Sequence, residues 1–188
     1  MSALQSSPIN LDLDLAFHPA NDDALTSLVN ADTKRRLTNA SPWQQDLTAW
    51  IESVRRDPTL TCPEIVRLSP MLSLGLQLTD DATITELNHA WRQRSETTDV
   101  LSFPALDNSL VLPTDTCVEL GDIVVSVQTA QRQAKQHSHE LGLELRWLVS
   151  HGLLHLLGWD HPTDQSLKTM LSYQEQLLSI NGKVHHHS

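Results

Sequence analysis

Alternating apolar and polar positions mark two strands in the first half of the chain. Every second residue is apolar in residues 9–17 and again in residues 71–79. A period of two is typical of a strand with one buried face. A short apolar run at residues 100–103 and a β-branched run at residues 123–127 predict two further strands. The pattern therefore predicts a small sheet.

Apolar residues at intervals of three and four predict the helices. The first such helix is expected to begin at Pro42, with Ser41 as its N-cap, and to end at Asp57. A second is expected over residues 84–91. Three more helices are predicted at about 128–141, about 144–157 and about 164–180.

Two segments lack a clear period. Residues 18–42 are polar and predict a loop or a short helix, and residues 105–118 predict a surface loop or a hairpin excursion. The element order is then strand, helix, strand, helix, two strands and three helices. This order predicts an α+β, or mixed α/β, fold in a single domain over residues 1–184. The remaining residues, 185–188, look like part of an expression tag.

Composition and charge narrow the class of protein. Of the 188 residues, 39% are hydrophobic and 19% charged, which is typical of a globular chain. No apolar run approaches the ~18 residues of a membrane span, and the N-terminus does not resemble a secretory signal. Cys62 and Cys117 are too few for a disulfide framework and are expected to be buried thiols in a reducing cytosol. We therefore expect a cytoplasmic protein with no membrane partner.

The net charge of −10 argues against a protein that coats nucleic acid, because phosphate binding depends on Lys and Arg. Any role on nucleic acid then needs a local basic patch or a basic protein partner. Arg132, Lys135 and Arg146 are candidates for such a patch, although a solvated helix face is the default interpretation.

Three histidines within eleven residues carry the clearest chemistry. His151 and His155 are four residues apart on an apolar helix, so they share one face. Gly158 is expected to end that helix and let the chain turn back, which brings His161 to the same place. Three imidazoles leave a fourth tetrahedral position for water, as in catalytic zinc sites. We therefore expect one zinc ion per chain, held by His151, His155 and His161.

The same ligand spacing occurs in metzincin proteases, which carry a glutamate directly after the first histidine. Gly152 occupies that position here, so no carboxylate is available there as a general base. The spacing therefore predicts the metal site without supporting protease chemistry.

The histidine run and two further blocks resemble the bacterial YbeY family of rRNA-maturation endoribonucleases. The resemblance covers about residues 71–178, whereas residues 1–45 are divergent. The blocks that carry it are HGLLHLLGWDH at 151–161, TDVLSFP at 98–104, LGDIV at 120–124 and the Glu86-Leu87-Asn88 and Trp91-Arg92 segment.

This resemblance implies a metalloprotease-like catalytic fold with a three-histidine zinc site. It implies a single-strand-specific, metal-dependent endoribonuclease acting at the 3′ end of small-subunit rRNA and in ribosome quality control. The implied partners are single-stranded rRNA and the small ribosomal subunit with its proteins, and no DNA is expected. His151, His155 and His161 match the family's zinc ligands, and Arg92 matches its functional arginine.

Several other residues are candidates with two interpretations each. Asp99 and Ser102 flank the strand expected near the site, and an Asp there is commonly a cap. Asp122 and Asp160 are turn residues or partners that orient a ligand histidine. Met170 is a core residue or packs beneath the metal, as a methionine does in metzincins.

The sequence is compatible with two other functions. A zinc hydrolase of another class, such as a peptidase, would use the same ligands, but the residue after His151 argues against it. A non-catalytic ribosome-assembly factor with a structural metal would suit the acidic charge, which favours docking to basic ribosomal proteins.

Overall fold

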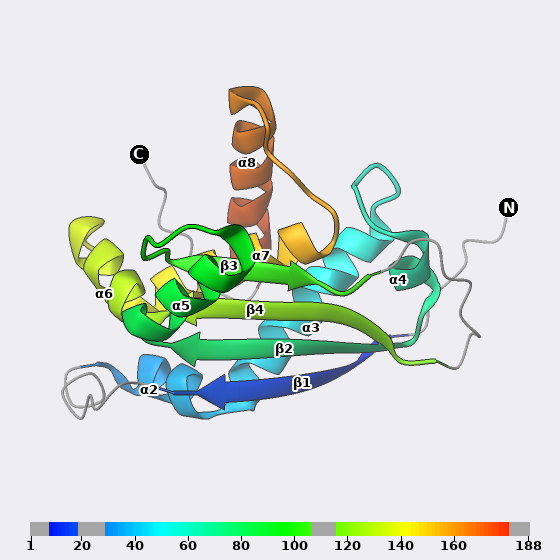
Figure 1. The fold of residues 1–188 in the computed structure, drawn as a ribbon. Coiled ribbons are helices and arrows are strands. Elements are labelled where there is room, and N and C mark those ends of the chain that lie inside the picture. The colour runs from blue at the N-terminus through cyan, green and yellow to red at the C-terminus, as the bar shows by residue number, and fades with distance from the viewer. Residues whose placement is uncertain (1–7, 19–28, 107–115, 181–188) are drawn as a thin grey trace, which may run out of the picture.

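A single mixed sheet of four strands organises the molecule (Figure 1). The computed structural model describes residues 8–18, 29–106 and 116–180. The strand order is β1-β2-β4-β3, with β1, β2 and β4 parallel and β3 antiparallel to β4. In chain order the elements are β1 (Asn10–Phe17), α2 (Ala31–Thr38), α3 (Ala40–Arg56), α4 (Glu64–Leu68), β2 (Met71–Thr79), α5 (Asp81–Arg92), β3 (Val100–Pro104), β4 (Val118–Ser126), α6 (Val127–Gln136), α7 (Leu141–Leu156) and α8 (Asp164–Ile180).

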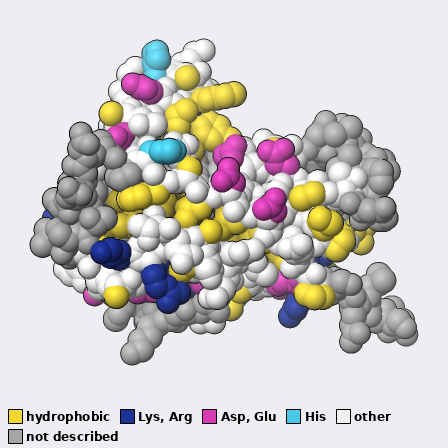
Figure 2. Space-filling view, turned by 90° about the horizontal axis from the view of Figure 1, so that it is seen from below, with side chains coloured by type: hydrophobic (Ala, Val, Ile, Leu, Met, Phe, Trp, Pro, Cys, Tyr) yellow, Lys and Arg dark blue, Asp and Glu magenta, His cyan; other side chains and the backbone are white. Residues whose placement is uncertain are grey.

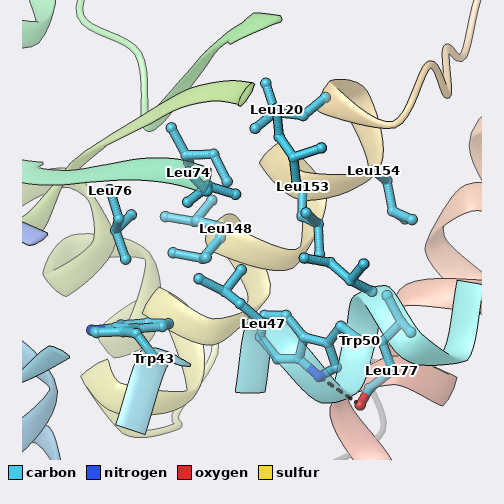
Figure 3. Close-up of a cluster of buried hydrophobic side chains, with 14 of the residues drawn as sticks. Trp43, Leu47, Trp50, Leu74, Leu76, Leu120, Leu148, Leu153, Leu154 and Leu177 are labelled. Atoms are coloured by element: carbon cyan, nitrogen blue, oxygen red, sulfur yellow. Dashed lines mark hydrogen bonds between the residues drawn. The ribbon is translucent and has the colours of Figure 1, made fainter. Parts of the chain in front are cut away.

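The main hydrophobic core lies between the sheet and the helices α3 and α7. Alternate residues of β2, from Leu72 to Leu78, are buried on this face, as the period of two requires. Trp43 and Trp50 of α3 are fully buried against them and against leucines of α7 (Figure 3). The Trp50 Nε1–H donates a 2.9 Å hydrogen bond to the Leu177 carbonyl, which joins α3 to α8.

The opposite face of the sheet is only partly covered. Helix α5 packs there through a small separate cluster of Ile84, Leu101 and Val124. Adjacent β4 residues, such as Ile123 and Val124, belong to the two different clusters because successive side chains of a strand point to opposite faces. The uncovered part of this face forms a groove beside α5.

The predicted fold class and the predicted order of strands and long helices are confirmed. The predicted N-cap was wrong: Asn39, not Ser41, caps α3, and its side-chain oxygen accepts a hydrogen bond from the Ser41 N–H. Strand β4 begins at Val118, earlier than predicted, and Val127 starts α6 because the Ser126 hydroxyl caps that helix. Helix α6 ends at Gln136 rather than near 141.

Two helices were not clearly predicted. Helix α2 lies within the segment expected to be a loop or a short helix, and the five-residue α4 was not predicted at all. A helix of one turn has too few residues for its period to be recognised. Of the loop predicted at 105–118, residues 107–115 lie outside the described part of the chain, as does the histidine run at 185–187.

The basic patch considered for Arg132, Lys135 and Arg146 does not exist as such. Arg146 is buried, and its Nε lies 2.9 Å from a carboxylate oxygen of the buried Asp46. Arg132 pairs with Asp81 at 2.8 Å. The long apolar stem of arginine allows this residue type to be buried when its charge is paired, so a sequence count overstates the available charge.

Two surface properties complete the description. Of the two cysteines, Cys62 is half-buried and Cys117 is exposed, so the expectation of two buried thiols was wrong for Cys117. No helix in the described ranges is both long and apolar enough to cross a membrane. The face drawn in Figure 2 shows scattered acidic and apolar side chains and only a few Lys or Arg side chains among the described residues, in keeping with the net charge of −10.

Candidate metal centre

The end of α7 gathers the three predicted histidines. Gly158 adopts φ +90°, the left-handed conformation that suits glycine at the end of a helix. The Trp159 N–H then donates to the Leu154 carbonyl at 3.0 Å, and the Gly158 N–H donates to the His155 carbonyl at 3.0 Å. This pair of bonds turns the chain back over the last turn of α7 and carries His161 toward the helix.

The rings of His151, His155 and His161 converge on one point. Their centroids are 4.7 Å apart for His151 and His155, 5.4 Å for His151 and His161, and 5.1 Å for His155 and His161. One ring nitrogen from each lies within 4.8 Å of the others. The Nε2 atoms of His151 and His155 are 3.1 Å apart, close to the roughly 3.4 Å expected for two nitrogens about 2.1 Å from one tetrahedral zinc ion.

Hydrogen bonds on the far side of two rings set their tautomers. The Nδ1–H of His151 donates to Gln174 Oε1 at 2.9 Å, and the Nδ1–H of His155 donates to the Trp159 carbonyl at 2.9 Å. The Gln174 orientation is fixed because its amide nitrogen donates to the Trp147 carbonyl and the Ser150 hydroxyl. With the proton on Nδ1, each Nε2 presents a lone pair to the shared point.

The environment favours neutral imidazoles. Burial lowers the pKa of His151, and the charge of His161 lowers it further, against the opposing effect of the Gln174 hydrogen bond. Burial likewise lowers the pKa of His155, and the neighbouring His151 adds to this effect. A neutral imidazole is the form that binds a metal ion. At neutral pH a cation can therefore bind His151 and His155 without first displacing a proton from either imidazolium.

Gln174, which accepts the hydrogen bond from His151, is a candidate site residue that sequence reasoning missed. It lies in α8, far from the motif, and is fully buried together with Met170 and Leu177 on the face of α8 that packs into the core. A polar residue on an otherwise apolar helix face was the available signal, because a buried amide needs hydrogen-bond partners. Met170 itself is fully buried within the main hydrophobic core.

Gly152 sits where α7 packs most closely on the sheet. A Cβ atom added there would lie 2.8 Å from Cγ2 of Ile123 and 3.1 Å from the Ser102 hydroxyl oxygen. That hydroxyl donates a 3.3 Å hydrogen bond to the Gly152 carbonyl, which ties β3 to α7 beside His151. The packing therefore leaves no room for the glutamate that metzincins carry at this position.

The acidic candidates have mainly local partners. Asp99 accepts hydrogen bonds from the Val100 N–H at 2.8 Å and from Gln133 Nε2 at 2.9 Å, and its charge acts to raise the pKa of His151. Asp160 accepts from the His161 N–H at 2.8 Å and so shapes the turn. Asp122 is on the groove side of β4, next to Gly75.

Arg92 is the last residue of α5 and is not part of the group that the three histidines form. It is exposed and lines the groove on the uncovered sheet face, a cavity of about 670 Å³. Trp91, 71% exposed, packs on Phe103 with ring centroids 5.6 Å apart at the same groove. Ser102 of β3 is among the residues that line the groove, and its hydroxyl donates to the Gly152 carbonyl of α7 on the other face of the sheet.

Known proteins resemble this chain over almost its whole length. A family model described as Endoribonuclease YbeY matches residues 30–182. The chain belongs to the YbeY family. The match begins well before residue 71, where the motif-based resemblance began, so the YbeY similarity includes α2 and α3.

Individual relatives carry the same family name. A protein of Prochlorococcus marinus (strain MIT 9313) named Endoribonuclease YbeY is 97% identical over 187 residues, which covers 100% of both chains. An Endoribonuclease YbeY of Synechococcus sp. (strain CC9311) is 52% identical over 172 residues, covering 92% of this chain and 97% of that one. A solution structure of TM1509 from Thermotoga maritima shares 18% identity with a TM-score of 0.48, covering 89% and 90% of the two chains.

Proposed function

We propose that this chain is a single-strand-specific, metal-dependent endoribonuclease that matures the 3′ end of small-subunit rRNA and takes part in ribosome quality control. Membership of a family described as Endoribonuclease YbeY supports the endoribonuclease activity. The observation that carries the metal dependence is the convergence of three histidine nitrogens at the end of α7.

The donor set fits zinc. His151 and His155 each have a protein acceptor on Nδ1, so their Nε2 atoms are available as neutral ligands. Two nitrogens 3.1 Å apart and a third within reach suit a small tetrahedral ion, and three protein ligands leave one position open. A divalent ion held here by His151, His155 and His161 supplies Lewis acidity toward a phosphate oxygen or water.

Arg92 is the proposed phosphate-binding residue. Its guanidinium carries five donors in a planar fork, which matches two oxygens of one phosphate. None of the ion pairs within the described residues occupies it. Asp14 and Asp122 line other parts of the same groove, so an RNA backbone is expected to follow the Arg92 side.

The aromatic pair beside Arg92 supports a preference for single strands. Trp91 and Phe103 form an exposed aromatic surface at the groove. An unpaired base can stack on such a surface, whereas bases inside a duplex are already stacked on one another. This gives a physical reason for single-strand specificity.

The net charge of the chain bears on its partners. A net charge of −10 disfavours unaided binding to a long polyanion, so we propose that basic proteins of the small ribosomal subunit bring the chain to its RNA. Because the proposed partner is the small ribosomal subunit, we also place the protein in the cytoplasm. A peptidase is disfavoured because the packing around Gly152 excludes the glutamate that such enzymes use.

The test compares cleavage of one RNA sequence presented as a single strand and as a duplex. The zinc-loaded chain should cleave the single strand faster, and His155→Ala and Arg92→Ala should each abolish most of that activity. Arg94→Ala is the matched control, because Arg94 is also exposed on the same segment but does not line the groove. Undiminished cleavage by His155→Ala would refute the metal dependence, and equal loss in Arg94→Ala would refute the role of Arg92.

A further inference from the structure

A second group of metal-binding side chains lies at the other end of α7. His137, the C-cap of α6, and His139 in the following turn both contact Glu144 in the first turn of α7. The three ligand atoms lie within 4.8 Å of one another. His137 Nδ1 is 3.5 Å from Glu144 Oε2, and His139 Nε2 hydrogen-bonds to the same oxygen. Both rings thus point at one carboxylate oxygen.

The backbone between the two histidines is bent to achieve this. Ser138 has φ +56°, a left-handed conformation that is uncommon for a residue with a side chain. The His139 N–H donates to the Ala134 carbonyl at 3.0 Å, so the turn ends α6 and directs His139 back toward α7. The two rings, two residues apart in sequence, therefore converge instead of pointing to opposite sides.

Glu144 is a buried carboxylate whose charge needs compensation. It is only 2% exposed. Among the residues that the structure describes, its ion-pair partners are these two imidazoles, and neither Lys nor Arg pairs with it. A buried carboxylate is stable when it is paired with a cation or binds a metal ion. A divalent ion held by the same three side chains would supply that positive charge.

We propose that His137, His139 and Glu144 bind a second divalent transition-metal ion of the zinc type. The separation of 3.5 Å between the His137 and Glu144 ligand atoms is close to the roughly 3.4 Å of neighbouring ligands on a tetrahedral zinc ion. Two imidazoles with one carboxylate favour Zn²⁺ over Mg²⁺ or Ca²⁺, which prefer oxygen ligands. His137, with 48% of its side chain exposed, leaves the outer side of the site open to solvent.

The role of this ion would be structural. It joins the end of α6 to the first turn of α7, seven residues before His151. Seven residues span about 10 Å of helix, so the two sites are separate but share one helix. An ion at this end holds α7 in place while the other end carries the catalytic ligands. The inference does not depend on the proposed nuclease activity.

The experiment counts zinc ions in the full-length chain. His185, His186 and His187 are first replaced by alanine, so that the C-terminal histidine run cannot bind zinc. This parent is incubated with zinc chloride, separated from free zinc by gel filtration, and its zinc content is measured by mass spectrometry. We expect about two ions per chain, because both clusters have three ligands of the kinds that bind zinc.

Single substitutions then assign each ion. His137→Ala should leave about one ion per chain and should reduce the zinc-induced rise in unfolding temperature, since a bound ion stabilises only the folded state. Glu144→Gln and His139→Ala should give the same loss where circular dichroism shows a native fold. If those two variants do not fold, His137→Ala alone tests the site, because a half-exposed side chain can be removed without disrupting the core. The matched control His89→Ala, also a histidine near the end of a helix, should retain both ions.

Two results would overturn the proposal. One is a parent chain that retains a single zinc ion, which would mean that a proton or solvent compensates Glu144. The other is a parent with two ions whose number is unchanged in His137→Ala. Retention of one ion by His137→Ala and of the other by His155→Ala would support two independent sites.

Discussion

The two ends of α7 both gather histidines, but their partners differ. At the C-terminal end the far nitrogens of His151 and His155 donate to neutral oxygens, those of Gln174 and of the Trp159 backbone. At the N-terminal end two imidazoles face the buried carboxylate of Glu144 directly. The first arrangement leaves ring nitrogens available around an open point, and the second places a negative charge in the site itself.

This difference distinguishes the proposed catalytic site from the proposed second metal site. A set of neutral ligands leaves an ion with its full charge, which is what polarises a phosphate oxygen or water. A carboxylate ligand neutralises part of that charge, and at the N-terminal end a bound ion would join α6 to α7. Substitutions at the C-terminal end are therefore expected to change the rate of RNA cleavage, and those at the N-terminal end the zinc content and the unfolding temperature.

The largest expected effect is on catalysis at the C-terminal end. His155→Ala should lower the rate of single-stranded RNA cleavage roughly 1000-fold, because metal-ion catalysis contributes several kcal/mol and each 1.4 kcal/mol is a factor of ten. The rate is measured with a fluorescent oligonucleotide in excess zinc. His89→Ala serves as control, and a comparable loss in that variant would mean that the effect is not specific to the metal ligands.

Gly152→Glu tests whether packing excludes a glutamate directly after His151. The new side chain would overlap Ile123 and bury a charge against the sheet, so the free energy of unfolding should fall by about 3 kcal/mol or more. Urea unfolding monitored by tryptophan fluorescence gives the value. Gln165→Glu places the same residue in an exposed part of α8 and should cost little. Equal stability of the two variants would show that packing does not exclude the glutamate.

Gln174→Met tests whether the hydrogen bond behind His151 matters for the ion. The thioether has nearly the same length but cannot hold the Nδ1–H as an amide oxygen does. Zinc affinity at the C-terminal end should fall about 10- to 100-fold, as for other residues that orient a metal ligand. Competition with a chromogenic chelator measures the affinity. An unchanged affinity would limit Gln174 to a packing role.

The smallest effect concerns the start of α6, the helix whose C-cap is His137. Hydrogen bonds from Arg132, Ser126 and Thr129 outweigh the raising effect of burial, so the pKa of Asp81 in the folded state lies below its ordinary value of 3.8. A carboxyl with a lowered pKa stabilises the fold above pH 3.8, and this stabilisation is lost as the pH falls below that value.

Asp81→Asn should therefore reduce the free energy of unfolding at neutral pH by about 1 kcal/mol or less, because the ion pair with Arg132 is partly exposed. The difference from the natural chain should shrink below pH 4. Thermal unfolding between pH 7 and pH 3 provides the comparison, with Asp12→Asn, at an exposed position of β1, as control. A difference that stays constant over this range would contradict the assigned electrostatic origin.

The periodic parts of the chain were predictable because their geometry is local. A period of two over residues 71–79 and intervals of three and four over α3 arise from the shapes of strand and helix themselves. Short elements such as α4 and the exact N-cap of α3 were not predictable, since neighbouring candidates such as Asn39 and Ser41 compete by small energies. The convergence of three histidines was predictable because one helix turn and one glycine suffice to produce it.

The sequence by itself determined the order of elements, the triad His151, His155 and His161, and the absence of a glutamate directly after His151. Only the tertiary structure decided that Gln174 of α8 supports His151, that Arg92 lines a groove on the α5 face of the sheet, and that Arg146 is buried in an ion pair. The physical reason is the distance along the chain over which each kind of interaction acts. Local geometry repeats every few residues and is visible in the chain, whereas a contact between distant elements depends on how whole faces pack.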